Sequence, residues 1–321
     1  MVNLVKKGFT MKSIICILFL FFSFSYAQTK VLYINSYHED FYSAVIQTKV
    51  VRDMLEPKGI KLKFVHMDTK RIKKDELRKI EALKVKKVIE GWKPNLVIAS
   101  DDSASKYVIS KWYKDSKIPF VFMGVNWSAK QYGYPYSNVT GQIEVDLAKE
   151  LIEELKKHAK GDKVAFLAGD TLTDQKTLNF YENNLGLKFD KVKLVNTFKE
   201  WKEAYVSLQK SVHVILFLNN AGIKNWDNTE ALNLVREVTK IPSGTTDQSL
   251  HPFVLISFAK DVHEYGEYAS ITALKILKGT PPSQIPITKN QRAKVSLNMT
   301  LAKKLNVIFP IKLIDMATLV K

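Results

Sequence analysis

The stretch N-L-V-I-A-S-D-D-S-A-S, residues 95–105, decides the fold prediction. Its apolar run, residues 96–99, is short, contains Val and Ile, and ends abruptly at polar residues. It therefore predicts a buried strand rather than a helix. Residues 104–112 predict the helix that follows. In an open α/β sheet the carboxyl end of a strand borders the ligand crevice. We therefore expect Ser100, Asp101, Asp102 and Ser103 to lie at such a crevice.

The same unit, an apolar strand followed by a polar turn and a helix, recurs along the chain. Strands that alternate with helices indicate right-handed βαβ units and a mostly parallel sheet. A Tyr-, Gly- and Pro-rich segment, residues 132–137, interrupts the rhythm, and a second α/β series starts at Asp146. The predicted strands span residues 30–36, 60–67, 96–99, 119–125, 138–144, 163–167, 191–198, 212–218, 241–247 and 253–258. The predicted helices span residues 41–55, 75–92, 104–112, 147–155, 178–185, 201–210, 229–239 and 262–277.

Amphipathic periodicity also predicts which side chains of a helix face the core. In the basic helix at residues 75–92, the larger apolar side chains Leu77, Ile80, Leu83 and Val88 recur at helical spacing. Such a stripe is typical of the buried face of a surface helix. We therefore expect these four side chains to point inward.

The N-terminal segment predicts export. Residues 1–13 carry three lysines and no acid, residues 14–24 are almost uniformly apolar, and Ser25-Tyr26-Ala27 places small residues at positions −3 and −1 before Gln28. This pattern is typical of a secretory signal peptide, and the apolar run is short for a membrane span. We expect residues 1–27 to be removed and the product to be periplasmic, with an uncleaved anchor as the alternative. Either Met1 or Met11 is the start.

Composition excludes several function classes. The single cysteine, Cys16, lies in the predicted signal peptide, so the mature chain has no disulfide and no thiolate metal site. Removing the three N-terminal lysines lowers the formal charge of +17 by three, to +14. The lysines are scattered along helices among acidic residues, and no RNP-like or zinc-finger pattern occurs. This favours solvated helix faces over nucleic-acid binding.

Enzyme motifs are missing from the sequence. It contains no G-x-S-x-G, P-loop or G-x-G-x-x-G pattern, and its six histidines show no H-x-H or H-E-x-x-H spacing. Two adjacent carboxylates at a helix start do not flank a glycosidic bond as hydrolases require. The sequence therefore predicts a protein that is not an enzyme and has no cofactor and no bound metal.

Motifs in a fixed order resemble those of a known family. The resemblance is to substrate-binding proteins of ABC transporters, in the family that has tryptophan- and tyrosine-binding members and also serves as the sensing domain of some sensor kinases. It covers nearly the whole mature chain. The similar segments are V-L-Y-I-N-S-Y-H (31–38), M-D-T-K-R (67–71), L-V-I-A-S-D-D-S-A (96–104), 119–126, V-T-G-Q-I-E (139–144), I-L-K-G-T-P-P-S-Q-I-P (276–286), 297–298, 302–305 and 309–310.

The resemblance implies a two-lobed type I periplasmic-binding-protein fold, with ligand held in the cleft between the lobes. It places three crossovers near Gln142, Ser257 and Ile285. The expected N-terminal lobe is residues 28–141 plus 257–284, and the expected C-terminal lobe is residues 142–256 plus 285–321. The implied function is capture of a small polar ligand for an ABC transporter permease. The alternative is a free-standing sensor that signals to a partner kinase. We expect a monomer and no nucleic-acid partner.

Candidate ligand contacts follow the predicted strands. One of Asp101, Asp102 and Ser100 is expected to cap the helix, which leaves a carboxylate free to accept an ammonium, hydroxyl or amide. Trp127 offers a flat surface for a ring, with ordinary lobe packing as the alternative. The predicted ligand-binding residues are Tyr37, His38, Ser100, Asp101, Asp102, Ser103, Asn126, Trp127, Asp170, Thr171, Asn219 and Asp247.

The predicted contacts also indicate the charge of the ligand. They include no arginine, and two carboxylates at one helix start would repel an anion that the helix terminus otherwise attracts. We therefore expect a zwitterionic or neutral polar ligand with an amine or hydroxyl facing an aspartate. An amino acid or a related amine-bearing metabolite fits this description best.

Overall fold

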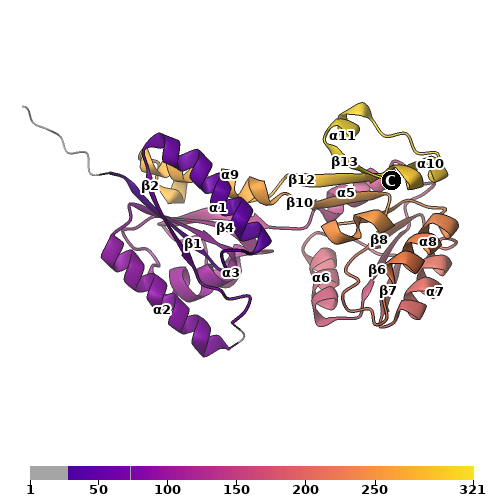
Figure 1. Cartoon of the computed structure of the whole chain (residues 1–321), viewed down its shortest axis with the longest axis horizontal. Helices are drawn as coiled ribbons and strands as arrows, with labels where there is room; N and C mark the ends of the chain where they lie inside the picture. The colour runs from indigo at the N-terminus through magenta and orange to yellow at the C-terminus, as the bar shows by residue number, and fades with distance from the viewer. Residues whose placement is uncertain (1–27, 73) are drawn as a thin grey trace, which may run out of the picture.

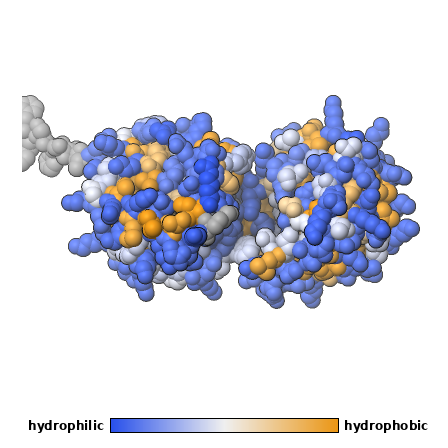
Figure 2. Space-filling model, turned by 60° about the horizontal axis from the view of Figure 1, so that its bottom comes forward, coloured by the Kyte–Doolittle hydropathy of each residue, from blue (hydrophilic) through white to orange (hydrophobic). Residues whose placement is uncertain are grey.

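The structure, a computed structural model, describes residues 28–72 and 74–321 and consists of two α/β lobes joined by several chain segments (Figure 1). The predicted signal peptide, residues 1–27, lies outside the described residues. Within the described part of the chain, no helix combines the length and the apolar character needed to cross a membrane. The surface is hollowed between the two rounded lobes (Figure 2).

The first lobe is built on a six-stranded parallel sheet with strand order β11-β5-β4-β3-β1-β2. Its central strands are apolar along their whole length because helices cover both faces of the sheet. Helices α1 and α9 cover one face, and α2 with α3 covers the other. The strands are β1 Lys30–Asn35, β2 Lys61–His66, β3 Leu96–Ser100, β4 Phe120–Asn126, β5 Val139–Glu144 and β11 Thr288–Lys289. The helices are α1 Tyr42–Leu55, α2 Asp75–Trp92, α3 Asp101–Ala104, α4 Ser110–Trp112 and α9 Val262–Leu277.

Helix α2 has the predicted bounds, but three of the four side chains predicted to point inward do not; only Val88 is half-buried and packs against the core. Leu77, Ile80 and Leu83 are 47%, 48% and 47% exposed, and the buried side chains are Ala82, Val85 and Ile89. The helix carries two apolar stripes at helical spacing. The stripe that contains Ala82, Val85 and Ile89 faces the sheet, and the stripe that contains Leu77, Ile80 and Leu83 faces solvent.

The helix after β3 begins earlier than predicted. It starts at Asp101 with α3, continues through a π-helical turn at Ser105–Ile109, and ends with α4. Ser100 occupies the N-cap position, but its own side chain makes no capping hydrogen bond; the Ser36 hydroxyl, from the turn after β1, accepts from the Ala104 amide at 2.9 Å instead. The expectation that Ser100 or one of the aspartates caps this helix was therefore wrong. The carboxyl of Asp101 lies against Gly124 of β4, and the carboxylate of Asp102 accepts from Asn126 and from two side chains of the loop after β4.

The second lobe is built on a seven-stranded sheet with strand order β13-β12-β10-β9-β8-β6-β7. Neighbouring strands are parallel except β10 and β12, which are antiparallel. The strands are β6 Val164–Gly169, β7 Lys191–Val195, β8 Val214–Phe217, β9 Ser243–Thr245, β10 Ile256–Lys260, β12 Ala293–Asn298 and β13 Ala317–Val320. The helices are α5 Ala148–Lys156, α6 Leu172–Asn183, α7 Phe198–Leu208, α8 Asn228–Val238, α10 Met299–Leu305 and α11 Ile311–Asp315, and short 3-10 turns include η4 Gln248–Phe253.

Three chain segments connect the sheets. They follow β5 of the first sheet, β10 of the second sheet and β11 of the first sheet. Hydrogen bonds tie them together: Asn290 Oδ1 accepts from the Val145 amide at 2.7 Å, and Gln142 Nε2 donates to Glu264 at 3.0 Å. We propose crossovers at residues 144–146, 260–262 and 289–293, a few residues beyond each predicted position. The lobe limits follow from these crossovers.

Candidate functional site

Asp101 lies at the carboxyl end of β3 with its side chain turned into the protein. The residue is 6% exposed, has a backbone φ of +65°, and its Oδ2 atom has no hydrogen-bond partner. Its carboxyl lies against Gly124, where φ is +69° and an added Cβ would come within 3.4 Å of Asp101 Oδ1. Glu144, from the end of β5, approaches the same place. The ends of three neighbouring strands therefore enclose this carboxyl.

Burial is the main reason that the pKa of Asp101 rises to about 8. The charge of Glu144 raises this pKa further, and hydrogen bonding from Ser100 and Tyr37 opposes the rise. The pKa of the Tyr37 hydroxyl is likewise raised, first by burial and then by the charge of Asp101. Near neutral pH this carboxyl therefore holds a proton in the free protein. A cation placed beside it would favour the charged form.

Two tyrosines border the Asp101–Glu144 pair. The ring of Tyr37 packs edge-on against Phe41 at 4.8 Å between centroids. Tyr265, on α9, is fully buried, and its hydroxyl has no hydrogen-bond partner. Burial, followed by the charge of Glu144, raises the pKa of the Tyr265 hydroxyl. Both phenols therefore stay protonated and can donate to a carboxylate.

Asp102 faces the loop after β4 instead. Its carboxylate accepts from Asn126 Nδ2 at 2.5 Å, from the Tyr132 hydroxyl at 2.7 Å and from Gln131 Nε2 at 3.5 Å. These contacts anchor the loop to the start of α3. Of the two adjacent carboxylates, the structure thus leaves Asp101 as the one with an unpartnered oxygen.

The histidine and serines of the predicted site have local roles. His38 lies 3.3 Å from Asp68 and 3.8 Å from Asp40, so it joins the turns after β1 and β2. The main-chain oxygen of Ser100 accepts from the Ser36 hydroxyl at 2.6 Å. Ser103 is half-buried on the first turn of α3. These residues shape the carboxyl edge of the sheet around Asp101.

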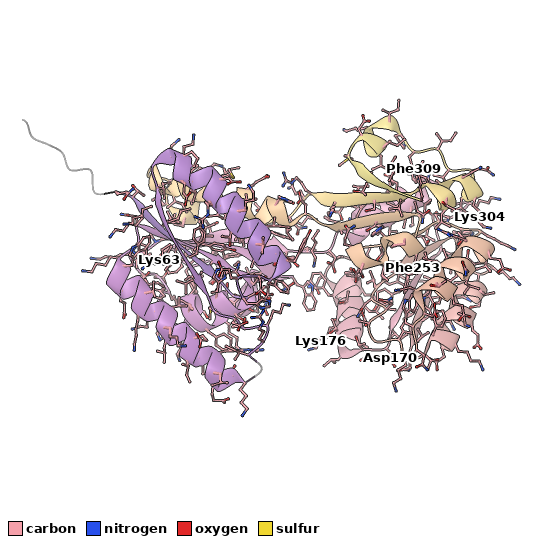
Figure 3. The ribbon with its side chains drawn as sticks, in the orientation of Figure 1. Lys63, Asp170, Lys176, Phe253, Lys304 and Phe309 are labelled. Atoms are coloured by element: carbon pink, nitrogen blue, oxygen red, sulfur yellow. The ribbon has the colours of Figure 1, made fainter. Side chains whose placement is uncertain are left out.

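Trp127 contacts the other lobe. Its indole, at the end of β4, stacks on Phe180 of α6 with centroids 5.2 Å apart and an interplanar angle of 20°. Figure 3 labels Lys176, on the same helix, at the side of the second lobe that faces the first. The two rings therefore form an aromatic contact between the lobes, and the contact of Trp127 with a ligand ring stays a prediction.

The second lobe presents a pocket of about 390 Å³ at the carboxyl ends of its strands. Asp174 is the most deeply buried acid in its lining; its Oδ2 accepts from Thr171 at 2.5 Å and from Asn219 at 3.1 Å. Burial raises the pKa of Asp174, hydrogen bonds from Thr171 and Asn219 oppose that rise, and the charge of Asp247 adds to it. The polar lining includes Asp146, Thr173, Asp174, Asn219, Thr246, Asp247 and Lys260.

Of the two aspartates predicted as ligand contacts in the second lobe, Asp247 lines the pocket and Asp170 does not. Asp247 caps the turn η4 by accepting from the Ser249 amide at 2.8 Å, and it also lines the pocket. Asp170 is exposed, accepts from Gln175 at 2.7 Å, and lies at the lower rim of the lobe in Figure 3. Thr171 caps α6 by accepting from the Asp174 amide. The structure thus brings Asn219 and Asp247 to the pocket and leaves Asp170 outside its lining.

Lys260 joins the two lobes at the end of β10. Its Nζ lies 2.6 Å from Glu144 of the first sheet and 3.1 Å from Asp146, at the start of the second lobe. Burial would lower the pKa of Lys260, but the carboxylates of Asp146 and Glu144 outweigh it and hold that pKa above the usual range. This ammonium is therefore fully engaged by two carboxylates.

Sequence reasoning did not select Glu144, Asp146, Asp174, Lys260 or Tyr265. Glu144 and Lys260 end a strand, so the strand-end rule that selected Asp101 could have found them. Asp174 and Tyr265 lie inside helices, where no local pattern separates them from ordinary helix residues. Over residues 28–72 and 74–321, no three side chains of the metal-ligating types are grouped so that they could hold an ion.

Comparisons with known proteins agree with this architecture. The sequence model of a family described as ABC transporter substrate binding protein matches residues 42–321. No curated protein matches the chain.

Three solved structures are similar in fold. The ligand-free, open structure of a substrate binding protein with adhesive properties from Clostridium difficile is 18% identical, with 91% of this chain and 99% of that chain covered and a TM-score of 0.64. An ABC domain in complex with L-Trp from Streptococcus pneumonia is 19% identical, with 92% and 100% covered and a TM-score of 0.52. A LacI transcriptional regulator from Lactobacillus brevis is 13% identical, with 83% and 99% covered and a TM-score of 0.54. At these identities the likeness shows the fold alone, and it confirms the predicted two-lobed periplasmic-binding-protein type I fold.

Proposed function

We propose that this chain, which belongs to the family of ABC transporter substrate binding proteins, captures a small polar ligand between its lobes in the periplasm and delivers it to an ABC transporter. The observation that carries the proposal is the pair of polar rims at the carboxyl ends of the two sheets. One rim holds Asp101 with its unpartnered oxygen, and the other holds the pocket around Asp174. Open α/β sheets bind ligands at this edge.

Lobe closure is the proposed mechanism of capture. A ligand that contacts both rims at once binds the closed state more tightly than the open state, so it shifts the population toward closure. We place the hinge at the three connections between the lobes, because the two sheets are separate and only these segments join them. The ion pairs of Lys260 with Glu144 and Asp146 lie at this hinge, so a charged ligand in the cleft would change their strength.

We assign ligand contact to Tyr37 and Asp101 on the first lobe and to Asn219 and Asp247 on the second. An ammonium or hydroxyl of the ligand donates to Asp101, and the ring of Tyr37 lies beside it. We assign a positioning role, without ligand contact, to Asp102, Asn126, Thr171 and the serines of β3 and α3. An amino acid or related amine-bearing metabolite suits this arrangement. We also propose that residues 1–27 are a cleaved signal peptide.

Ligand binding is expected to make the protein more compact. Native mass spectrometry of the protein as purified from the periplasm should show a retained small molecule. X-ray scattering of the mature chain, before and after removal of that molecule, should then give a smaller radius of gyration for the bound form. A protein that binds its ligand at saturation with no change of radius would contradict capture by lobe closure.

The Trp127–Phe180 stack should favour the arrangement of lobes seen here. Aromatic pairs contribute about 0.5–1.5 kcal/mol beyond area burial, so Trp127→Ala should shift the lobe equilibrium by about 2- to 10-fold. If closure separates the rings, the ligand-free variant becomes more compact and binds more tightly. Scattering and calorimetric affinity test this, with Trp127→Phe as the control that keeps an aromatic ring. Equal behaviour of the alanine and phenylalanine variants would show that the stack has no part in the equilibrium.

A further inference from the structure

A second cavity of the C-terminal lobe lies at the opposite ends of its strands from the pocket around Asp174. It has a volume of about 400 Å³ and lies among the turns at residues 158–163, 209–213 and 240–242, which precede β6, β8 and β9. Leu305 lines it, and Figure 3 shows the preceding residue, Lys304, on the side of this lobe that lies away from the first lobe. The cavity is therefore separate from the ligand cleft.

Four lysines line this cavity, and no carboxylate belongs to the lining that the described residues form. The four are Lys160, Lys163, Lys210 and Lys240. Over residues 28–72 and 74–321, none of their ammonium groups makes a hydrogen bond or an ion pair. Carboxylates of the adjoining chain are engaged elsewhere, because Asp162 lies 3.7 Å from Lys156 and Glu154 pairs with Lys157. The positive charge of the cavity is thus not compensated by side chains.

Helix ends account for only part of this charge. Helices α5, α7 and α8 end beside the cavity, and the carboxyl end of a helix attracts cations. Each such end carries about half an elementary negative charge, whereas each of the four lysines carries a full positive charge. The lysines therefore outweigh the three helix ends, and the excess positive charge favours an anion in the cavity.

Hydrogen bonds hold the three turns together before any ligand binds. The Lys163 amide donates to His213 Nδ1 at 3.1 Å, so the neutral imidazole carries its proton on Nε2, where it can donate. The ring packs against Gly161, where an added Cβ would lie 2.6 Å from His213 Cε1. Gln209 Oε1 accepts from the Lys240 amide at 2.8 Å. The backbone that carries Lys163 and Lys240 is therefore fixed in place.

We propose that this cavity is a second ligand site, and that it binds a phosphate group. Lysine is a common phosphate ligand, and a phosphomonoester carries about 1.5–2 negative charges at neutral pH. Val212, Ile241 and Pro242 give the lining an apolar part that suits the organic portion of a phosphate ester. The phosphate belongs either to a free phosphorylated solute or to a phospholipid headgroup. In both cases Lys163 and Lys240, from two different turns, contact its oxygens.

Calorimetry on the mature chain tests this site with inorganic pyrophosphate as the probe. The paired change Lys163→Gln and Lys240→Gln should weaken binding by about tenfold or more, because each lysine supplies a charge-assisted hydrogen bond. The control pair, Lys87→Gln and Lys117→Gln, removes the same charge from exposed positions of the first lobe and should leave the affinity unchanged. Malonate, which has two carboxylates in place of two phosphates, should bind about tenfold more weakly than pyrophosphate because it carries less charge.

Sedimentation with lipid vesicles distinguishes the two sources of the phosphate. If the site takes a headgroup, phosphatidylglycerol vesicles should bind wild type and should bind the cavity variant about tenfold less. Phosphatidylcholine vesicles, whose headgroups have no net charge, should bind neither protein. Binding of pyrophosphate without binding of phosphatidylglycerol vesicles would identify the ligand as a free solute.

The site assignment is overturned if neither pyrophosphate nor phosphatidylglycerol vesicles bind, or if the cavity variant binds them like wild type. Equal weakening by the control pair would show that net charge alone attracts the anion, and would overturn it as well. Malonate that binds as tightly as pyrophosphate would overturn the assignment to phosphate. None of these results bears on capture in the cleft, because the cavity shares no lining residue with the pocket around Asp174.

Discussion

Asp101→Asn is expected to make the protein more stable at neutral and alkaline pH while weakening its binding of an amine-bearing ligand. The pKa of Asp101 is about 8 in the folded protein and about 4 in an unfolded chain. Between these values the folded state binds more protons than the unfolded state, so the free energy of unfolding falls as pH rises. Asparagine does not titrate, and it tolerates the positive φ of this position. We expect a gain of about 2–4 kcal/mol at pH 8 and little gain at pH 4.

Denaturant unfolding of both proteins at a series of pH values measures this gain. Asp102→Asn is the informative comparison, because the Asp102 carboxylate accepts from Asn126, Gln131 and Tyr132 and its loss should lower stability. A stability difference between wild type and Asp101→Asn that stays constant from pH 4 to pH 8 would contradict the raised pKa. The same pKa predicts that wild-type affinity for an ammonium ligand rises with pH up to about 8, since Asp101 must first lose its proton beside Glu144 and Tyr37.

Most strands were predictable from the sequence because both sheets are covered on two faces. A strand buried on both faces is a short, continuous apolar run, and β3, β4, β6 and β8 are of this kind. The polar residues that follow such a run mark the carboxyl end of the strand, and this rule predicted that Asp101 lies at the edge of the sheet. The segment of β12, by contrast, is no continuous apolar run, and its pairing with β10 depends on a partner distant in sequence. No local signal therefore singled it out as a strand.

The sequence could not predict which side chains contact one another in the folded protein. Asp101 and Asp102 are adjacent and identical in type, and what separates them is the loop after β4, whose side chains reach Asp102 and leave Asp101 beside Glu144. The buried face of α2 was mispredicted for a related reason, since two apolar stripes competed and only the packed sheet decides between them. Contacts between lobes, such as Lys260 with Glu144, depend on both folded sheets at once.

Lys260→Met is expected to destabilise the protein at neutral pH much more than at acidic pH. The change removes the cation that lies between Glu144 and Asp146, whose side chains are only 18% and 16% exposed. Breaking a largely buried ion pair from one side leaves uncompensated charge and costs about 3–5 kcal/mol when burial is complete. Because the Lys260 side chain is 31% exposed, we expect a loss of about 2–4 kcal/mol at pH 7.5. The loss should fade as pH falls and the carboxylates become protonated.

The matched control for that loss is Lys289→Met, which removes an ion pair with Glu150 at 3.3 Å whose two side chains are about half exposed. Exposed pairs contribute about 0–1 kcal/mol, so this variant should unfold nearly like wild type. Thermal unfolding of wild type and the two variants at pH 5 and pH 7.5 measures the two losses. Equal losses in the two variants at pH 7.5 would show that Glu144 and Asp146 do not depend on Lys260 for their charge balance, and the hydrogen bonds of Asn290 and Gln142 would then hold the connections between the lobes.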